Sequence, residues 1–139
     1  MYKELFETGR QTNPYIKITA PAKQEAIFRA EALLKCRFPD ELKMYLLEID
    51  GDGDLYFSAE QIPKENCFLR KALAECYPDL DHYLFVAGNG CGDYYGYRLV
   101  DGKVQNSDII LWDHETNTDK VVAQSLDSLI TLMYIDGVL

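Results

Sequence analysis

The sequence predicts an α+β fold, in which a single domain carries a mainly antiparallel sheet with helices packed on one face. Three observations predict it. Apolar residues recur at helical spacing up to about residue 76, change to a period of two from Tyr83, and return to helical spacing from Ser125. Helices followed by a run of strands and a closing helix are typical of an α+β protein. At 139 residues, the chain has the length of one domain.

The first half is predicted to be mainly helical. Pro21 lies in the first turn of one helix, and Phe38-Pro39-Asp40 ends that helix and caps the next. From these signals we predict helices at residues 21–35 and Glu41–Ile49, a turn at Asp50–Asp54, a short strand at Leu55–Phe57, a capped helical turn from Ser58 that ends at Pro63, and a helix at Glu65–Cys76.

The second half is predicted to form an antiparallel meander. Asp101-Gly102 is a strong signal for a two-residue hairpin turn, and Gly88–Gly92 is a tight glycine-rich loop. We predict strands at Tyr83–Ala87, Asp93–Val100, Val104–Asp113 and Lys120–Ala123, and then a helix capped by Ser125 that runs through Tyr134.

The charge is negative and unevenly distributed. The net charge is −9, and residues 1–47 hold 8 basic and 6 acidic side chains, whereas residues 48–139 hold 6 and 17. Such an acidic surface repels nucleic acid and anionic membranes, and it attracts basic proteins. No apolar run approaches the roughly 18 residues of a membrane span. We therefore expect a protein partner, with neither nucleic acid nor a membrane involved.

The four cysteines are expected to be reduced thiols. They form no CxxC pair, and the charged residues of Met1–Glu7 do not resemble a secretory signal, so we expect a cytoplasmic protein. Cys67 and Cys76 fall in a predicted helix and are interpreted as small core residues.

Three segments resemble the SUKH superfamily, which includes yeast regulators of cell-wall synthesis and bacterial immunity proteins that neutralise secreted toxins. They are Phe38–Gly51, Phe85–Tyr97 with its glycine-rich turn before Gly92-Asp93-Tyr94-Tyr95, and Trp112–Glu115; the closing helix is similar too. With that helix the resemblance covers about residues 21–135. It implies an α+β fold and a binding role rather than catalysis. The aspartates of Asp50–Asp54 depart from the family pattern, and residues 58–80 match no part of it.

Two motifs are similar to ion-binding or phosphate-binding loops, but each lacks residues that such a site requires. Asp50-Gly51-Asp52-Gly53-Asp54 opens like a calcium loop, but position 6 is Leu55 and position 12 is Gln61, so the required glycine and glutamate are missing. The loop at Gly88–Gly92 precedes a strand rather than a helix and has no cation to hold phosphate. Two histidines and dispersed cysteines give no zinc spacing. We expect no metal and no cofactor.

A cysteine hydrolase centred on Cys91, with His114 and Asp113, is a further hypothesis. The sequence shows no helix N-terminus that would activate Cys91 and no oxyanion hole. Thiol titration would test this hypothesis. We expect no catalytic residue.

The strand Asp93–Val100 is the richest in aromatic residues. Alternation places Tyr95 with Asp93 on one face and Tyr94 on the other, so that one face meets the helices and the other can remain open. Tyrosine and tryptophan suit protein recognition. We predict an acidic, tyrosine-rich partner-binding face made of Asp50, Asp52, Asp54, Asn89, Asp93, Tyr94, Tyr95, Trp112, Asp113 and Glu115. The first hypothesis is an immunity protein that covers a basic toxin domain such as a nuclease, and the second is a regulatory scaffold like the yeast relatives.

Overall fold

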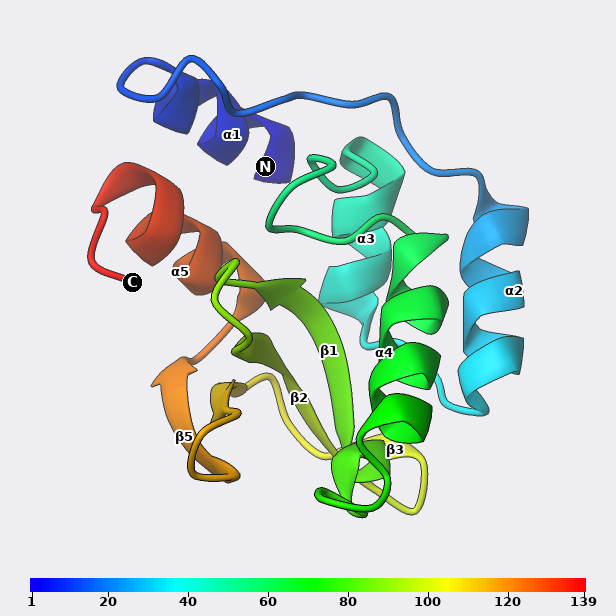
Figure 1. The fold of residues 1–139 in the computed structure, drawn as a ribbon. Helices are drawn as coiled ribbons and strands as arrows, with labels where there is room; N and C mark the ends of the chain where they lie inside the picture. The colour runs from blue at the N-terminus through cyan, green and yellow to red at the C-terminus, as the bar shows by residue number, and fades with distance from the viewer.

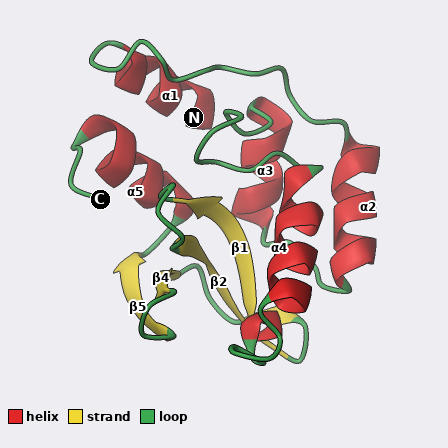
Figure 2. Ribbon diagram, in the orientation of Figure 1, coloured by secondary structure: helices red, strands yellow, loops and turns green.

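The second half of the chain forms an antiparallel sheet, as predicted. The computed structural model describes all of residues 1–139. Its strands are β1 (Tyr83–Gly88), β2 (Tyr94–Val100), β3 (Lys103–Val104), β4 (Ile109–Asp113) and β5 (Thr118–Ala123). The order across the sheet is β1-β2-β4-β5, with the short β3 paired to β2, and every pair is antiparallel (Figure 2). Apart from the short β3, strands that follow one another along the chain lie side by side in the sheet, so β1, β2, β4 and β5 form a meander.

The helices pack around this sheet and make the fold α+β. They are α1 (Tyr2–Arg10), α2 (Gln24–Leu34), α3 (Asp40–Glu48), α4 (Gln61–Ala72) and α5 (Leu126–Ile130), which continues as a π-helical turn, η2 (Thr131–Ile135). Figure 1 shows α4 alongside β1, with α2 on the outer side of α4; α1 and α5 lie at the other side of the molecule, and α3 lies between α1 and α2. None of these helices has both the length and the apolar composition needed to cross a bilayer.

Two helices in the first half differ from their prediction. The capped turn and the third predicted helix form one helix, α4, which begins at Gln61 and ends at Ala72. Pro63 was expected to end the turn, but it lies in the first turn of α4, where a proline loses no hydrogen bond because the first amides have no partner within the helix. The helix α1 was not predicted, although its Tyr2 and Phe6 are buried in the core.

The strand predictions need two corrections. The hairpin turn at Asp101-Gly102 is confirmed, and both residues have positive φ. The predicted strand Val104–Asp113 is interrupted, because residues 105–108 form a loop that separates β3 from β4. The predicted strand Leu55–Phe57 contributes only one isolated bridge, from Tyr56 to Ala87 of β1.

The outer edge of β1 is sealed by side-chain and loop contacts. Asn66 of α4, which is 1% exposed, accepts a hydrogen bond from the Phe85 amide (2.9 Å) and donates one to the Phe85 carbonyl (2.8 Å). Beyond it, the Phe57 amide donates to the Val86 carbonyl, and the Gly88 amide donates to the Leu55 carbonyl. The edge strand therefore leaves few backbone groups free to pair with another chain.

Candidate partner-binding surface

The glycine-rich turn between β1 and β2 is held by the side chain of Asn89. Its Oδ1 accepts from the amides of Cys91 (2.8 Å) and Asp93 (3.3 Å), and its Nδ2 donates to Asp93 Oδ2 (3.1 Å). Gly90 and Gly92 have φ values of 78° and 99°, which residues other than glycine rarely adopt. The turn is consequently a fixed structure, and Asn89 shapes it from within.

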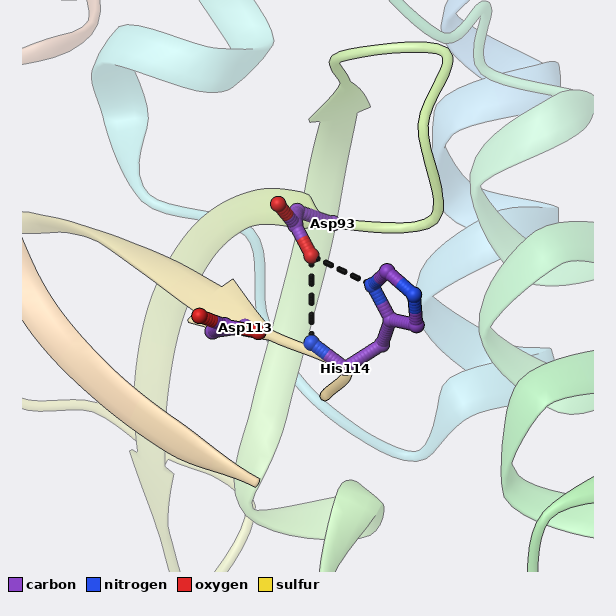
Figure 3. Close-up of side chains that lie close together, drawn as sticks. All are labelled: Asp93, Asp113 and His114. Atoms are coloured by element: carbon purple, nitrogen blue, oxygen red, sulfur yellow. Dashed lines mark hydrogen bonds and ion pairs between the residues drawn. The ribbon is translucent and has the colours of Figure 1, made fainter. Parts of the chain in front are cut away.

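An ion pair joins this turn to the turn that follows β4. Asp93 Oδ1 lies 2.6 Å from His114 Nδ1 and also accepts from the His114 amide at 3.1 Å (Figure 3). These hydrogen bonds lower the pKa of Asp93 and raise the pKa of His114, since each group stabilises the charged form of the other. A Cβ at Gly92 would lie 3.0 Å from the imidazole ring, so the close approach requires glycine there.

The two carboxylates and the imidazole at this junction are a candidate metal site. Atoms of Asp93, Asp113 and His114 that could bind a metal lie within 4.8 Å of one another. However, Asp93 and His114 are hydrogen-bonded to each other, and Asp113 Oδ1 accepts from the Glu115 amide at 2.8 Å. In Figure 3 Asp113 points away from the imidazole ring. The donors are thus engaged in stabilising two turns rather than converging on one point.

An acidic hollow of about 250 Å³ lies beside the glycine-rich turn. Asp54, Glu65 and Asp93 line it, and they come from the Asp-rich loop, α4 and the turn itself. Tyr94 and Phe57, whose rings pack at 6.2 Å, supply an aromatic wall. No basic residue lines this hollow, so its carboxylates attract a cation. We call the surface formed by Asp54, Glu65, Asp93, Tyr94, Asp113 and Glu115 the acidic surface.

Three of the residues predicted for the binding face are buried, which contradicts the expectation that they are exposed. Tyr95 is 2% exposed and Trp112 is 0% exposed. Tyr95 lies on one side of the sheet, and Trp112 packs against Tyr77 and Phe85 on the other side; both side chains belong to the hydrophobic core. That second side is covered by the segment between α4 and β1, so it does not remain open around Trp112.

Asp52 is the third buried residue, at 1% exposure, and the expectation of an exposed acidic turn is wrong at this position. Its Oδ1 accepts from the amides of Asp54 (2.8 Å) and Tyr56 (3.0 Å), and its Oδ2 accepts from the Tyr134 hydroxyl. Burial and then the hydrogen bond to Asp52 raise the pKa of Tyr134. Asp52 therefore fastens the Asp-rich loop to the C-terminal helix.

The remaining predicted residues are at least partly exposed. Asp54 and Glu115 are exposed, and Asp93, Tyr94 and Asp113 are half-buried; Asn89 and Asp50 are half-buried too, and the latter accepts from the Ala59 amide at 2.7 Å. Glu65 was not predicted as a site residue, because no local sequence pattern indicates that this position on α4 faces the glycine-rich turn.

The cysteines are located differently from the sequence interpretation. Cys67 and Cys76 are exposed rather than in the core, and only Cys36 is buried. Cys91 is exposed in the glycine-rich turn, where its amide donates to Asn89. No hydrogen bond joins the Cys91 thiol to His114, so the pair lacks the contact of an activated nucleophile with its base.

The sequence profile of the SMI1 / KNR4 family (SUKH-1) matches residues 21–131. The match includes the Asp-rich loop, the glycine-rich turn and all five strands. No curated protein matches the chain closely enough to count as a relative.

Proposed function

Since this chain belongs to the SMI1 / KNR4 family (SUKH-1), we propose that it is an immunity protein that binds and neutralises a basic toxin domain in the cytoplasm. The superfamily includes such immunity proteins. The observation that carries the proposal is the acidic hollow at the glycine-rich turn, in which the carboxylates of Asp54 and Glu65 have no ionic partner and lie beside an aromatic wall, while the third carboxylate, Asp93, is paired with His114. A nuclease domain, whose active site must hold a polyanion, would present the complementary charge.

The hollow suits a lysine or arginine side chain of the partner. Its volume of about 250 Å³ equals roughly eight water molecules, which leaves room for a cationic head group. Asp54 and Glu65 would accept its hydrogen bonds, and each hydrogen bond to a charged group contributes about 1.5–3 kcal/mol. Tyr94 would add a cation–π contact.

A rigid frame supports binding at this surface. The Asn89 hydrogen bonds and the Asp93–His114 pair hold the turn in one conformation before a partner arrives, which lowers the entropy lost on association. We propose binding rather than catalysis, because His114 and Asp93 serve each other and Cys91 has no base. The same surface could serve a regulatory scaffold, and the partner identified by experiment distinguishes the two functions.

The direct test is co-expression of the chain with the toxin domain encoded beside its gene. We expect growth to be rescued and the two proteins to co-purify in a complex that weakens as salt rises, because charge attraction is screened. Rescue without a stable complex would contradict neutralisation by binding, and an affinity that is indifferent to salt would contradict the electrostatic part of the proposal.

Variants of the hollow locate the interface. Glu65→Lys and Asp54→Lys should each weaken the complex by more than about 1 kcal/mol, because a cation would then face a cation. Glu25→Lys is the matched control, since Glu25 is an exposed carboxylate on α2 and does not line the hollow. Circular dichroism checks that each variant remains folded. Equal affinities for all three variants would place the interface elsewhere on the molecule.

A further inference from the structure

A hollow of about 1000 Å³ lies at the opposite end of β2 from the glycine-rich turn. One rim is the connection between α2 and α3, and the other is the β2–β3 hairpin with the loop that follows it (Figure 1). Lys35 and Arg37 line the first rim, and Lys103 lines the second. We call this feature the cationic hollow.

The three cations have no ionic partner within the protein. The salt bridges of the structure include none of Lys35, Arg37 and Lys103. Glu31 also lines the hollow, but its Oε2 accepts from the Phe38 amide at 2.7 Å and lies 3.6 Å from Lys43 Nζ, so its charge is matched. Asp101 is the remaining acidic residue of the lining. The hollow is therefore cationic on a chain whose net charge is −9.

The backbone adds hydrogen-bond donors, and the two rims lie close together. The amides of Arg37, Asn106 and Ser107, three of the lining residues, donate no hydrogen bond within the protein. The rims are close, since a Cβ at Gly102 would lie 3.1 Å from the Lys35 carbonyl oxygen. Lys35 ends α2 with φ 53° and ψ 41°, a left-handed conformation that glycine adopts most easily. The residue at this position is nevertheless a lysine.

We propose that the cationic hollow binds an acidic segment of a partner protein. An extended peptide is favoured over an enclosed small molecule, because the lining is open to solvent: Lys35, Arg37, Lys103, Asn106 and Ser107 are all exposed. The carboxylates of such a segment would pair with the cations on both rims, and the guanidinium group of Arg37 can donate two parallel hydrogen bonds to one carboxylate. The free backbone N–H groups would donate hydrogen bonds to the remaining carboxylate oxygens. This site is separate from the acidic surface and does not depend on the proposed function.

The test is a titration of the isotope-labelled chain with a twelve-residue peptide of alternating glutamate and glycine, followed by amide NMR shifts. We expect the shifts to gather at residues 35–39 and 101–107 and the affinity to fall with salt. The variant with Lys35→Glu, Arg37→Glu and Lys103→Glu should bind at least tenfold more weakly. The control with Lys23→Glu, Lys71→Glu and Lys120→Glu makes the same change in net charge at exposed cations elsewhere, and should stay within twofold of the original chain.

Each other outcome overturns the proposal. Equal losses in both triple variants would mean attraction by net charge alone, and shifts spread over the whole surface would mean the same. Binding of inorganic tripolyphosphate at these residues, without binding of the peptide, would assign the hollow to a small phosphate ligand instead. Absence of binding by both probes at millimolar concentration and low salt would leave the cations without a ligand role. The variant with Lys35→Glu, Arg37→Glu and Lys103→Glu should still protect cells against the toxin. Loss of peptide binding and loss of protection therefore test the two proposals separately.

Discussion

Replacement of Asn66 by alanine should destabilise the fold more than any surface change. The Asn66 side chain makes three hydrogen bonds at 2.8–2.9 Å, one to the Ile62 carbonyl and two to the backbone of Phe85. The alanine variant leaves the Phe85 N–H and C=O buried without partners, at about 1–3 kcal/mol each. The Ile62 carbonyl lies within α4 and keeps its helical hydrogen bond. Alanine recovers about 0.5 kcal/mol through helix propensity and about 1 kcal/mol of side-chain entropy.

The net loss worked from these contacts is about 0.5–4.5 kcal/mol, at its upper end a large part of the roughly 5–15 kcal/mol that stabilises a domain. Urea unfolding followed by the fluorescence of Trp112 measures it, because this single tryptophan is fully buried and becomes exposed on unfolding. Asn106→Ala, at an exposed loop position, should lose less than about 1 kcal/mol. A loss below about 0.5 kcal/mol for Asn66→Ala would refute the reasoning, since it would mean that water reaches the Phe85 backbone and the edge of β1 is not sealed.

Three further predictions concern other parts of the molecule. Gly96→Ala should prevent folding, because its Cβ would lie 2.1 Å from the Leu84 carbonyl oxygen in the middle of the sheet, and a native-like circular dichroism spectrum would contradict this. The pKa of His114 should exceed its ordinary value of 6.5 and return toward it in Asp93→Asn, which NMR titration of the imidazole measures. Because the pKa of His114 is raised in the folded protein, the ion pair stabilises the fold fully below about pH 6.5, and this contribution is lost as the pH rises through the pKa of His114. Because the pKa of Asp93 is lowered, Asp93 remains charged in acid, and its contribution is lost only as the pH falls below 3.8. A thiol reagent should label three cysteines quickly and the buried Cys36 only on unfolding, and mass spectrometry of the labelled chain would reveal any other pattern.

The sequence predicted the elements that are built from periodic patterns. The helices α2 and α3, the strands β1 and β2 and the hairpin at Asp101-Gly102 were found because their apolar spacing or turn residues are local. The helix α1 was missed, since its charged residues concealed the apolar pair Tyr2 and Phe6. The start of α4 was misplaced because Pro63 was interpreted as the end of a helical turn rather than as a residue of the first turn.

The candidate site was predicted only in part, because loops have no period that reveals burial. Asp52 and Asp54 are two residues apart in one turn, yet Asp52 is buried through a contact with Tyr134, which lies 82 residues away in the sequence. Tyr95 and Trp112 were assigned to a surface because alternation separates two faces without saying which face is covered. The segment that covers Trp112 includes Tyr77, and its position depends on the whole fold.

The length of β2 has a consequence for how the molecule can hold its partners. This strand of seven residues separates the acidic surface from the cationic hollow by about 20 Å. Physiological salt screens electrostatic interactions over about 8 Å, so a charge at one end of β2 has little effect on the binding energy at the other end. The two proposed sites would therefore bind partners of opposite charge at the same time, each with the affinity it has alone.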